Sequence, residues 1–188
     1  MSIQQVPLTY ESVLDLIQKS NLETRLVIQD VAKQLKETQR EVGKLGGRIG
    51  DIVVSMVKGD IAAKFRAFGY KDLDDHCSQN VKFRNKKLGI KGEVDLLLEN
   101  GDVAVLIEVK TTLETSDVSK HVERLEKFRR WADAKGNAKK RYIGAVAGAV
   151  VTDEAEEMAH ENGMYVIVQS GDAVEIITPP DGFVAKEW

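Results

Sequence analysis

The chain of 188 residues is 43% hydrophobic and 30% charged, which predicts a soluble globular fold that buries a core of its own. The single cysteine, Cys77, excludes an internal disulfide and a cysteine-rich zinc site. No apolar run is long enough to span a membrane and no secretory signal pattern begins the chain, so we expect a cytoplasmic protein without a membrane partner. The net charge of −3 means that any DNA binding must come from local basic patches.

Residues 1–45 are predicted to form a helical extension to a domain that spans residues 46–188. From about Thr9 to Lys44 the seam residues recur at alternating spacings of three and four, the heptad pattern of a coiled coil. Two interpretations remain open: a stalk through which two copies form a homodimer, and an amphipathic helix that folds back on its own domain. The seam consists of Leu14, Ile17, Asn21, Thr24, Ile28, Val31, Leu35, Thr38, Val42 and Leu45.

A glycine-rich segment should separate this extension from the next helix. Gly43, Gly46, Gly47 and Gly50 are expected to break the first helix, because glycine is a poor helix former. Apolar residues then recur at helical spacing over 49–68, and Gly69 is placed where a helix commonly ends.

The next segment combines a predicted strand with a run of positive charge. Residues 76–86 read as a strand with Val81 and Phe83 facing inward. Five basic residues with no acid between them could contact DNA phosphates, although lysines that protect an edge strand would give the same pattern. These residues are Lys82, Arg84, Lys86, Lys87 and Lys91.

A β-hairpin is predicted around Asn100-Gly101, which lies between two apolar runs, 94–98 and 103–109. A type I′ turn with these two residues at its centre would place Leu98 opposite Val103 and Glu93 opposite Glu108.

The two faces of this hairpin differ sharply. One is wholly apolar and consists of Val94, Leu96, Leu98, Val103, Val105, Ile107 and Val109. The other is apolar only near the turn, at Leu97, Ala104 and Leu106, and ends in Glu93, Asp95, Glu108 and Lys110. Carboxylates this close suit a hard cation, Mg²⁺ or Mn²⁺, and the lysine could orient a water. A solvated salt-bridge face is the plainer interpretation of the same residues.

Asp95 followed by Glu108-Val109-Lys110 resembles the PD-(D/E)xK motif of the restriction-endonuclease-like nucleases, with Val94 in place of the proline. Residues 46–177 also resemble a group of uncharacterised bacterial proteins of this superfamily that carry a helical N-terminal extension. The resemblance implies that Asp95, Glu108 and the Val109 carbonyl bind Mg²⁺ and that Lys110 assists the attacking water.

The resemblance also assigns auxiliary roles. In this superfamily the first helix often supplies a further metal-site glutamate, but the expected position holds Val54, which cannot ligate a metal. Asp51 could substitute from the preceding turn, although a solvated acid at a helix start is the simpler explanation, and Glu93 could also be auxiliary.

A basic helix is predicted after the hairpin, from Ser116 or Asp117 to about Ala134. Residues 120–141 contain nine basic and three acidic residues. Lys120, Arg124 and Lys127 are therefore predicted to line a DNA channel, with a charged solvent face as the alternative.

The remaining elements are a strand at 142–151, a helix at 153–162 and strands at 164–168 and 173–178. Their order matches an α/β, restriction-endonuclease-like αβββαβ core, a mixed sheet flanked by helices, preceded by a long coiled-coil-like helix. His76, His121 and His160 show no metal-ligand spacing and are expected at the surface. The sequence predicts a metal-dependent DNA endonuclease or, alternatively, a catalytically inactive nuclease-fold module for DNA binding or protein assembly.

Overall fold

The computed structural model describes residues 9–70, 73, 77–171 and 173–188. Side chains at 41–52, 56, 59 and 60 lie outside this description. The chain divides into two compact units, Met1–Gly47 and Arg48–Trp188. No described helix combines the length and the apolar character that crossing a membrane would need.

The first helix, α1 (Tyr10–Ala67), runs through all four glycines that were expected to break it. That prediction was wrong because glycine in a helix interior costs about 1 kcal/mol relative to alanine but does not forbid helical geometry. The end of the helix agrees with the sequence, since Gly69 takes a left-handed φ of 100°. Within residues 10–40 the apolar side chains of the seam are exposed: Leu14 is 39% exposed, and Ile17, Ile28, Val31 and Leu35 are each more than half exposed.

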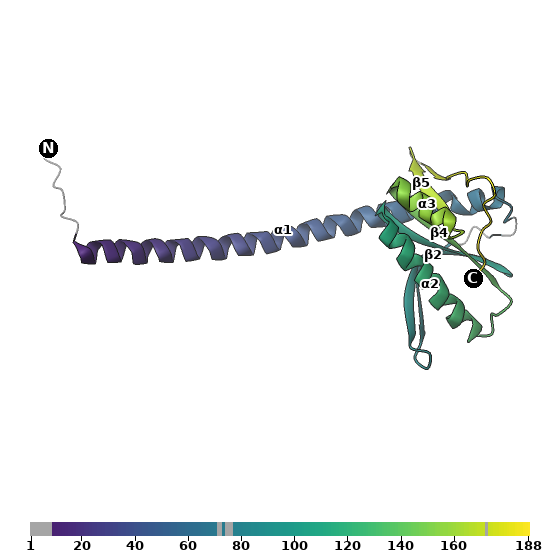
Figure 1. Ribbon diagram of the computed structural model, residues 1–188, viewed down its shortest axis with the longest axis horizontal. Helices are drawn as coiled ribbons and strands as arrows, with labels where there is room; N and C mark the ends of the chain where they lie inside the picture. Colours follow the sequence, from purple (N-terminus) through teal and green to yellow (C-terminus); the bar gives the residue numbers. More distant parts are fainter. Residues whose placement is uncertain (1–8, 71–72, 74–76, 172) are drawn as a thin grey trace. The chain divides into compact units, whose positions relative to one another are not determined.

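The second unit contains one mixed sheet with the strand order β1-β2-β3-β4-β5-β6 (Figure 1). Its strands are β1 (Cys77–Asn85), β2 (Ile90–Asn100), β3 (Val103–Leu113), β4 (Arg141–Val151), β5 (Tyr165–Ser170) and β6 (Ala173–Ile176). The β3–β4 and β4–β5 pairs are parallel and the others antiparallel. Helices α2 (Thr115–Asp133) and α3 (Asp153–Glu161) make the two parallel crossovers. The predicted α/β fold, with a mixed sheet flanked by helices, is confirmed.

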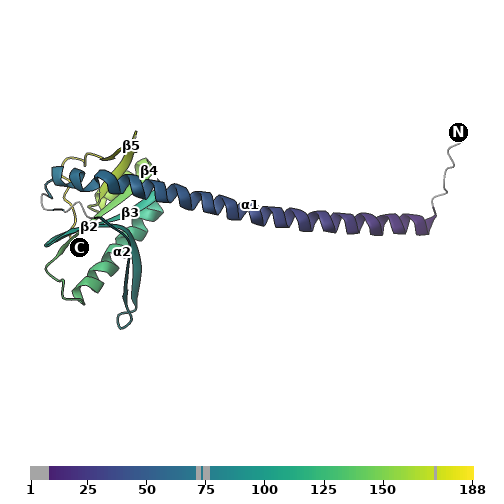
Figure 2. The same cartoon turned by 180° about the vertical axis from the view of Figure 1, so that it is seen from behind.

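Each face of the sheet buries its own core. Val57, Ile61 and Phe65 from the end of α1 pack with Leu96 and Ile107 on one face, and Figure 2 shows this part of α1 in front of the sheet. The opposite face packs against α2 and α3 through Val118, Leu125, Phe128, Ala155 and Ala159. Burial on both faces explains why β3 and β4 read as almost continuous apolar runs.

The β2–β3 hairpin differs from its predicted register by two residues. Leu98 pairs with Val105, and Asn100 pairs with Val103, so Gly101 and Asp102 form the turn. Neither Asn100 nor Gly101 takes a positive φ, so the predicted type I′ turn does not form. Burial of alternate side chains fixes only which face each residue occupies, and a shift of two residues preserves that assignment.

The strand pairing is interrupted at Asp95. β2 pairs with β3 over Leu96–Asn100, and its pairing with β1 skips Asp95 and the opposing residue Asn80, whose φ is 51°. Beyond this irregularity Val94 packs into the α2 side of the sheet rather than with Leu96. Its predicted place on the apolar face was therefore wrong, because a break in the ladder turns the following residues to the other face.

Candidate active site

The interruption of β2 places the Asp95 carboxylate beside the Glu108-Val109-Lys110 segment of β3. One carboxylate oxygen, Oδ2, accepts a hydrogen bond from the Val109 backbone N–H at 2.8 Å. This bond replaces a strand-to-strand backbone bond at the point where the regular ladder stops. It fixes one Asp95 oxygen and holds the side chain next to the residues that the sequence predicted as its partners.

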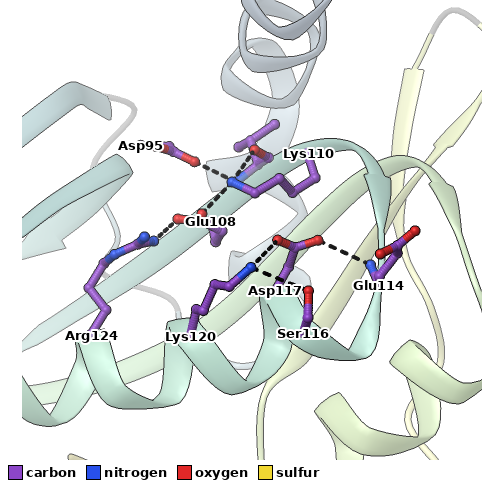
Figure 3. A network of polar contacts seen from close by, with 9 residues as sticks. Asp95, Glu108, Lys110, Glu114, Ser116, Asp117, Lys120 and Arg124 are labelled. Atoms are coloured by element: carbon purple, nitrogen blue, oxygen red, sulfur yellow. Dashed lines mark hydrogen bonds and ion pairs between the residues drawn. The ribbon is translucent and has the colours of Figure 1, made fainter.

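Glu108 is the buried charge at the centre of the site, with an exposed fraction of 3%. Its Oε1 contacts the Lys110 ammonium, and its Oε2 contacts the guanidinium of Arg124 from α2 (Figure 3). The Lys110 Nζ also lies 3.4 Å from the Val109 carbonyl oxygen. Two cations therefore offset the cost of taking this carboxylate out of water.

His121 lies beneath the site, and its predicted surface position was wrong. The side chain is fully buried at 0% exposure, and its Nε2 lies 3.2 Å from the Leu106 carbonyl oxygen. Val118, His121, Leu125 and Phe128 recur at spacings of three and four on the buried face of α2, so helical periodicity could have revealed this position.

The environment of His121 keeps its ring neutral. Burial lowers its pKa to about 4, and this outweighs the opposing effects of the hydrogen bond to Leu106 and the nearby Asp95 charge. A neutral ring can donate its Nε2 proton to the Leu106 carbonyl. Nδ1 is then an acceptor without a hydrogen-bond partner among the described residues.

His121 and Arg124 fix α2 against β3 at two successive positions. The two residues are three apart on one helix face, and their partners Leu106 and Glu108 are two apart on one strand face. Arg124, which was predicted to line a DNA channel, has its guanidinium against Glu108. No local pattern in the sequence distinguishes Arg124 from the other cations of α2, so this link could not be predicted.

The other basic residues predicted to bind DNA have less specific surroundings. On α2, Lys127 lies 3.1 Å from Glu123. Lys120 lies 3.8 Å from Asp117 and 3.3 Å from Ser116, as Figure 3 shows. Lys82, Arg84, Lys86 and Lys87 are exposed on β1 and in the turn that follows it.

Of the two predicted auxiliary residues, Glu93 has a described side chain, and no described contact joins it to the carboxylate pair. Glu93 lies 3.8 Å from Lys82 on the outer part of β2. The side chain of Asp51 lies outside the described residues, as does His76. Val54 is partly buried against the α1-side core. Among the described residues no three His, Cys, Asp or Glu side chains gather as a metal site, so the predicted ligands are two carboxylates and one carbonyl.

Parts of the chain are similar to proteins of known structure. No protein-family model matches the chain, and no curated protein matches it. A solved structure of a protein of unknown function matches 70% of this chain and 62% of its own, with 14% identity and a TM-score of 0.42. A complex of EndoMS with dsDNA matches 66% of this chain and 46% of its own, with 17% identity and a TM-score of 0.36. A repair endonuclease from Pyrococcus abyssi matches 55% of this chain and 40% of its own, with 18% identity and a TM-score of 0.34. The chain thus spans less than two thirds of each of these proteins, and only the site's own geometry bears on function.

Proposed function

We propose that this chain is a Mg²⁺-dependent endonuclease that hydrolyses phosphodiester bonds in DNA. The observation that carries the proposal is that the Lys110 ammonium contacts both the buried Glu108 carboxylate and the Val109 carbonyl. Asp95 is fixed to the same segment through the Val109 N–H. A purely structural ion pair would not need a second carboxylate tied to the same three residues.

The donor set fits Mg²⁺ or Mn²⁺. Asp95, Glu108 and the Val109 carbonyl supply hard oxygen atoms, and Mg²⁺ is commonly held by one or two carboxylates together with water and substrate phosphate. The Lys110 ammonium already contacts two of these three groups, so their oxygens face a common point that favours positive charge. When bound, the ion would polarise the phosphate and lower the pKa of a coordinated water.

The residues of the chain would then divide the remaining work. Lys110 would hold the attacking water and stabilise negative charge as it develops on the phosphate. Arg124 would keep Glu108 in position from α2, and His121 would hold that helix against β3 through the Leu106 carbonyl. Exposed cations outside the site would bind the DNA backbone.

Two observations favour the catalytically inactive alternative. Both Glu108 oxygens already contact cations, and the helix position expected to supply another carboxylate holds Val54, which packs against the core. In that case the ion-pair network would serve the fold, and the protein would be a DNA-binding or assembly module.

Plasmid cleavage separates the two functions. Supercoiled plasmid and single-stranded DNA are incubated with Mg²⁺, Mn²⁺ or EDTA, and the wild type is compared with Asp95→Asn and Lys110→Met. We expect metal-dependent cutting that both variants lose. Asp102→Asn and Lys139→Met are matched controls at exposed positions away from the site and should cut like the wild type. A folded wild type that cuts neither substrate would contradict the proposal.

We also propose that the protein is a homodimer formed through the seam of α1. All ten seam positions are uncharged, and the described apolar ones are exposed. A second copy would bury them in the heptad packing of a coiled coil. Sedimentation analysis should show a dimer for the wild type and a monomer for Ile28→Lys. A monomeric wild type at micromolar concentration would refute this proposal.

A further inference from the structure

The part of the β1–β2 hairpin beyond Asp95 forms a two-stranded arm, residues 81–94. β2 pairs with β3 only over Leu96–Asn100, whereas its pairing with β1 continues to Ile90. The arm therefore leaves the sheet at the candidate active site. Figures 1 and 2 both show it extending alongside α2.

One face of the arm is braced on α2. The Phe83 ring lies 5.1 Å from that of Phe128 and 5.9 Å from that of Trp131. Gly92, which pairs with Phe83, leaves the space for this ring, because a Cβ there would lie 2.3 Å from it. Phe83 is 2% exposed, so the arm has a packed apolar face and a fixed orientation.

The opposite face and the tip carry unneutralised positive charge. Residues 81–94 contain five basic residues and one acid, Glu93, in a chain whose net charge is −3. Lys82 contacts that acid, but among the described residues no carboxylate contacts the other basic side chains, Arg84, Lys86, Lys87 and Lys91. On α2, by contrast, Lys120 and Lys127 each lie near an acid one turn away.

Protection of an exposed sheet edge accounts for only part of this pattern. Lysines on a strand edge prevent edge-to-edge pairing, and both strands of the arm are edges, because β2 pairs with β3 only over Leu96–Asn100. Lys91 on β2 stands opposite Arg84 on β1. Lys86 and Lys87 lie in the turn between the strands. The positive charge thus covers both strands and the tip, as expected for a surface that binds a polyanion.

The shape of the arm favours a duplex over a single strand. A two-stranded ribbon fits the major groove of B-DNA, which is about 12 Å wide. Proteins that bind single strands usually stack bases on exposed aromatic side chains, and the one aromatic residue of the arm, Phe83, is buried against α2. Lys91 and Asp95 are four residues apart on β2, about 13 Å at the usual strand rise.

We infer that the arm binds the phosphate backbone of double-stranded DNA on one side of the bond presented to Asp95 and Glu108. The inference rests on the proposed nuclease function for the position of that bond, but the binding itself does not need catalysis. It assigns the duplex contacts to Arg84, Lys91 and the tip of the arm rather than to α2.

Duplex binding as a function of salt tests the inference. Fluorescence anisotropy with a 30-bp duplex and a single strand of the same sequence is measured in EDTA over a range of KCl concentrations. We expect the wild type to prefer the duplex. Arg84→Gln/Lys91→Gln should reduce the slope of log K against log[KCl] by about 1.8, since each lost phosphate contact removes about 0.9. Both side chains are exposed, so the fold should persist, and circular dichroism checks this.

The double variant Lys19→Gln/Lys33→Gln, which removes the same charge from exposed positions of α1, is the control and should keep the wild-type slope. An unchanged slope in the arm variant, an equal loss in the control, or a wild-type preference for the single strand would each overturn the inference. Duplex binding that depends on the arm, without plasmid cleavage, would support the inference and refute the nuclease. Plasmid cleavage, together with a salt slope that the arm variant leaves unchanged, would support the nuclease and overturn the inference.

Discussion

The two faces of α2 hold similar polar groups at similar spacings in different surroundings. On the face toward β3, Arg124 contacts Glu108, which is 3% exposed, and His121 is fully buried. On the outer face, Lys127 lies 3.1 Å from Glu123, whose side chain is 69% exposed. Desolvation makes a buried charge costly unless it is paired, whereas water screens an exposed pair. The comparison predicts large effects on the inner face and small ones on the outer face.

The largest effect is expected from Arg124→Met. It leaves the buried Glu108 carboxylate with Lys110 alone, and breaking a buried pair costs about 3–5 kcal/mol in the free energy of unfolding. Urea denaturation at pH 7 measures this cost. In a Glu108→Gln background the same substitution should cost far less, because no buried charge is then left behind. Equal costs in the two backgrounds would show that the pairing with Glu108 is not the cause.

A smaller and pH-dependent effect is expected at His121. Its pKa is about 4 in the folded protein and near 6.5 when unfolded, so the unfolded chain takes up the proton first as the pH falls. The stability from the neutral ring is complete above pH 6.5 and declines toward pH 4. Between pH 7 and pH 4 the wild type should lose about 3 kcal/mol more than His121→Gln, which cannot titrate. Parallel pH profiles for the two proteins would contradict the buried, neutral ring.

The smallest effect is expected from Lys127→Met on the outer face. An exposed pair one helical turn apart contributes about 0.3–0.5 kcal/mol, and salt screens it. Denaturation at low and at high salt should therefore show a small loss that disappears in 1 M NaCl. A loss above about 1 kcal/mol would mean that the two faces of α2 do not differ as their burial indicates.

Alternation along the strands predicted which side chains share a sheet face but not their partners. Asp95, Glu108 and Lys110 were expected on one face, and the structure brings them together. The observed β2–β3 register differs from the predicted one by two residues. Burial of one face excludes a register shift by an odd number of residues but allows a shift by an even number. The interruption at Asp95 left no clear signal in the sequence, since it depends on how β1, β2 and β3 meet.

Helical periodicity had the same limits. It predicted helices over most of α1 and α2, and it could have placed His121 inside. It could not show whether the glycines would interrupt α1, because the stability of the rest of the helix can offset a cost of about 1 kcal/mol per glycine.

The sequence alone determined the element types, the sheet faces of the regular strands and the grouping of Asp95, Glu108 and Lys110, because these follow from local periodicity and hydrophobic burial. Only the tertiary structure decided that Arg124 contacts Glu108, that His121 is buried on Leu106, and that the basic arm leaves the sheet at Asp95. Those features depend on residues far apart in the chain, and which of them meet is settled by packing between helix and sheet rather than by any local pattern.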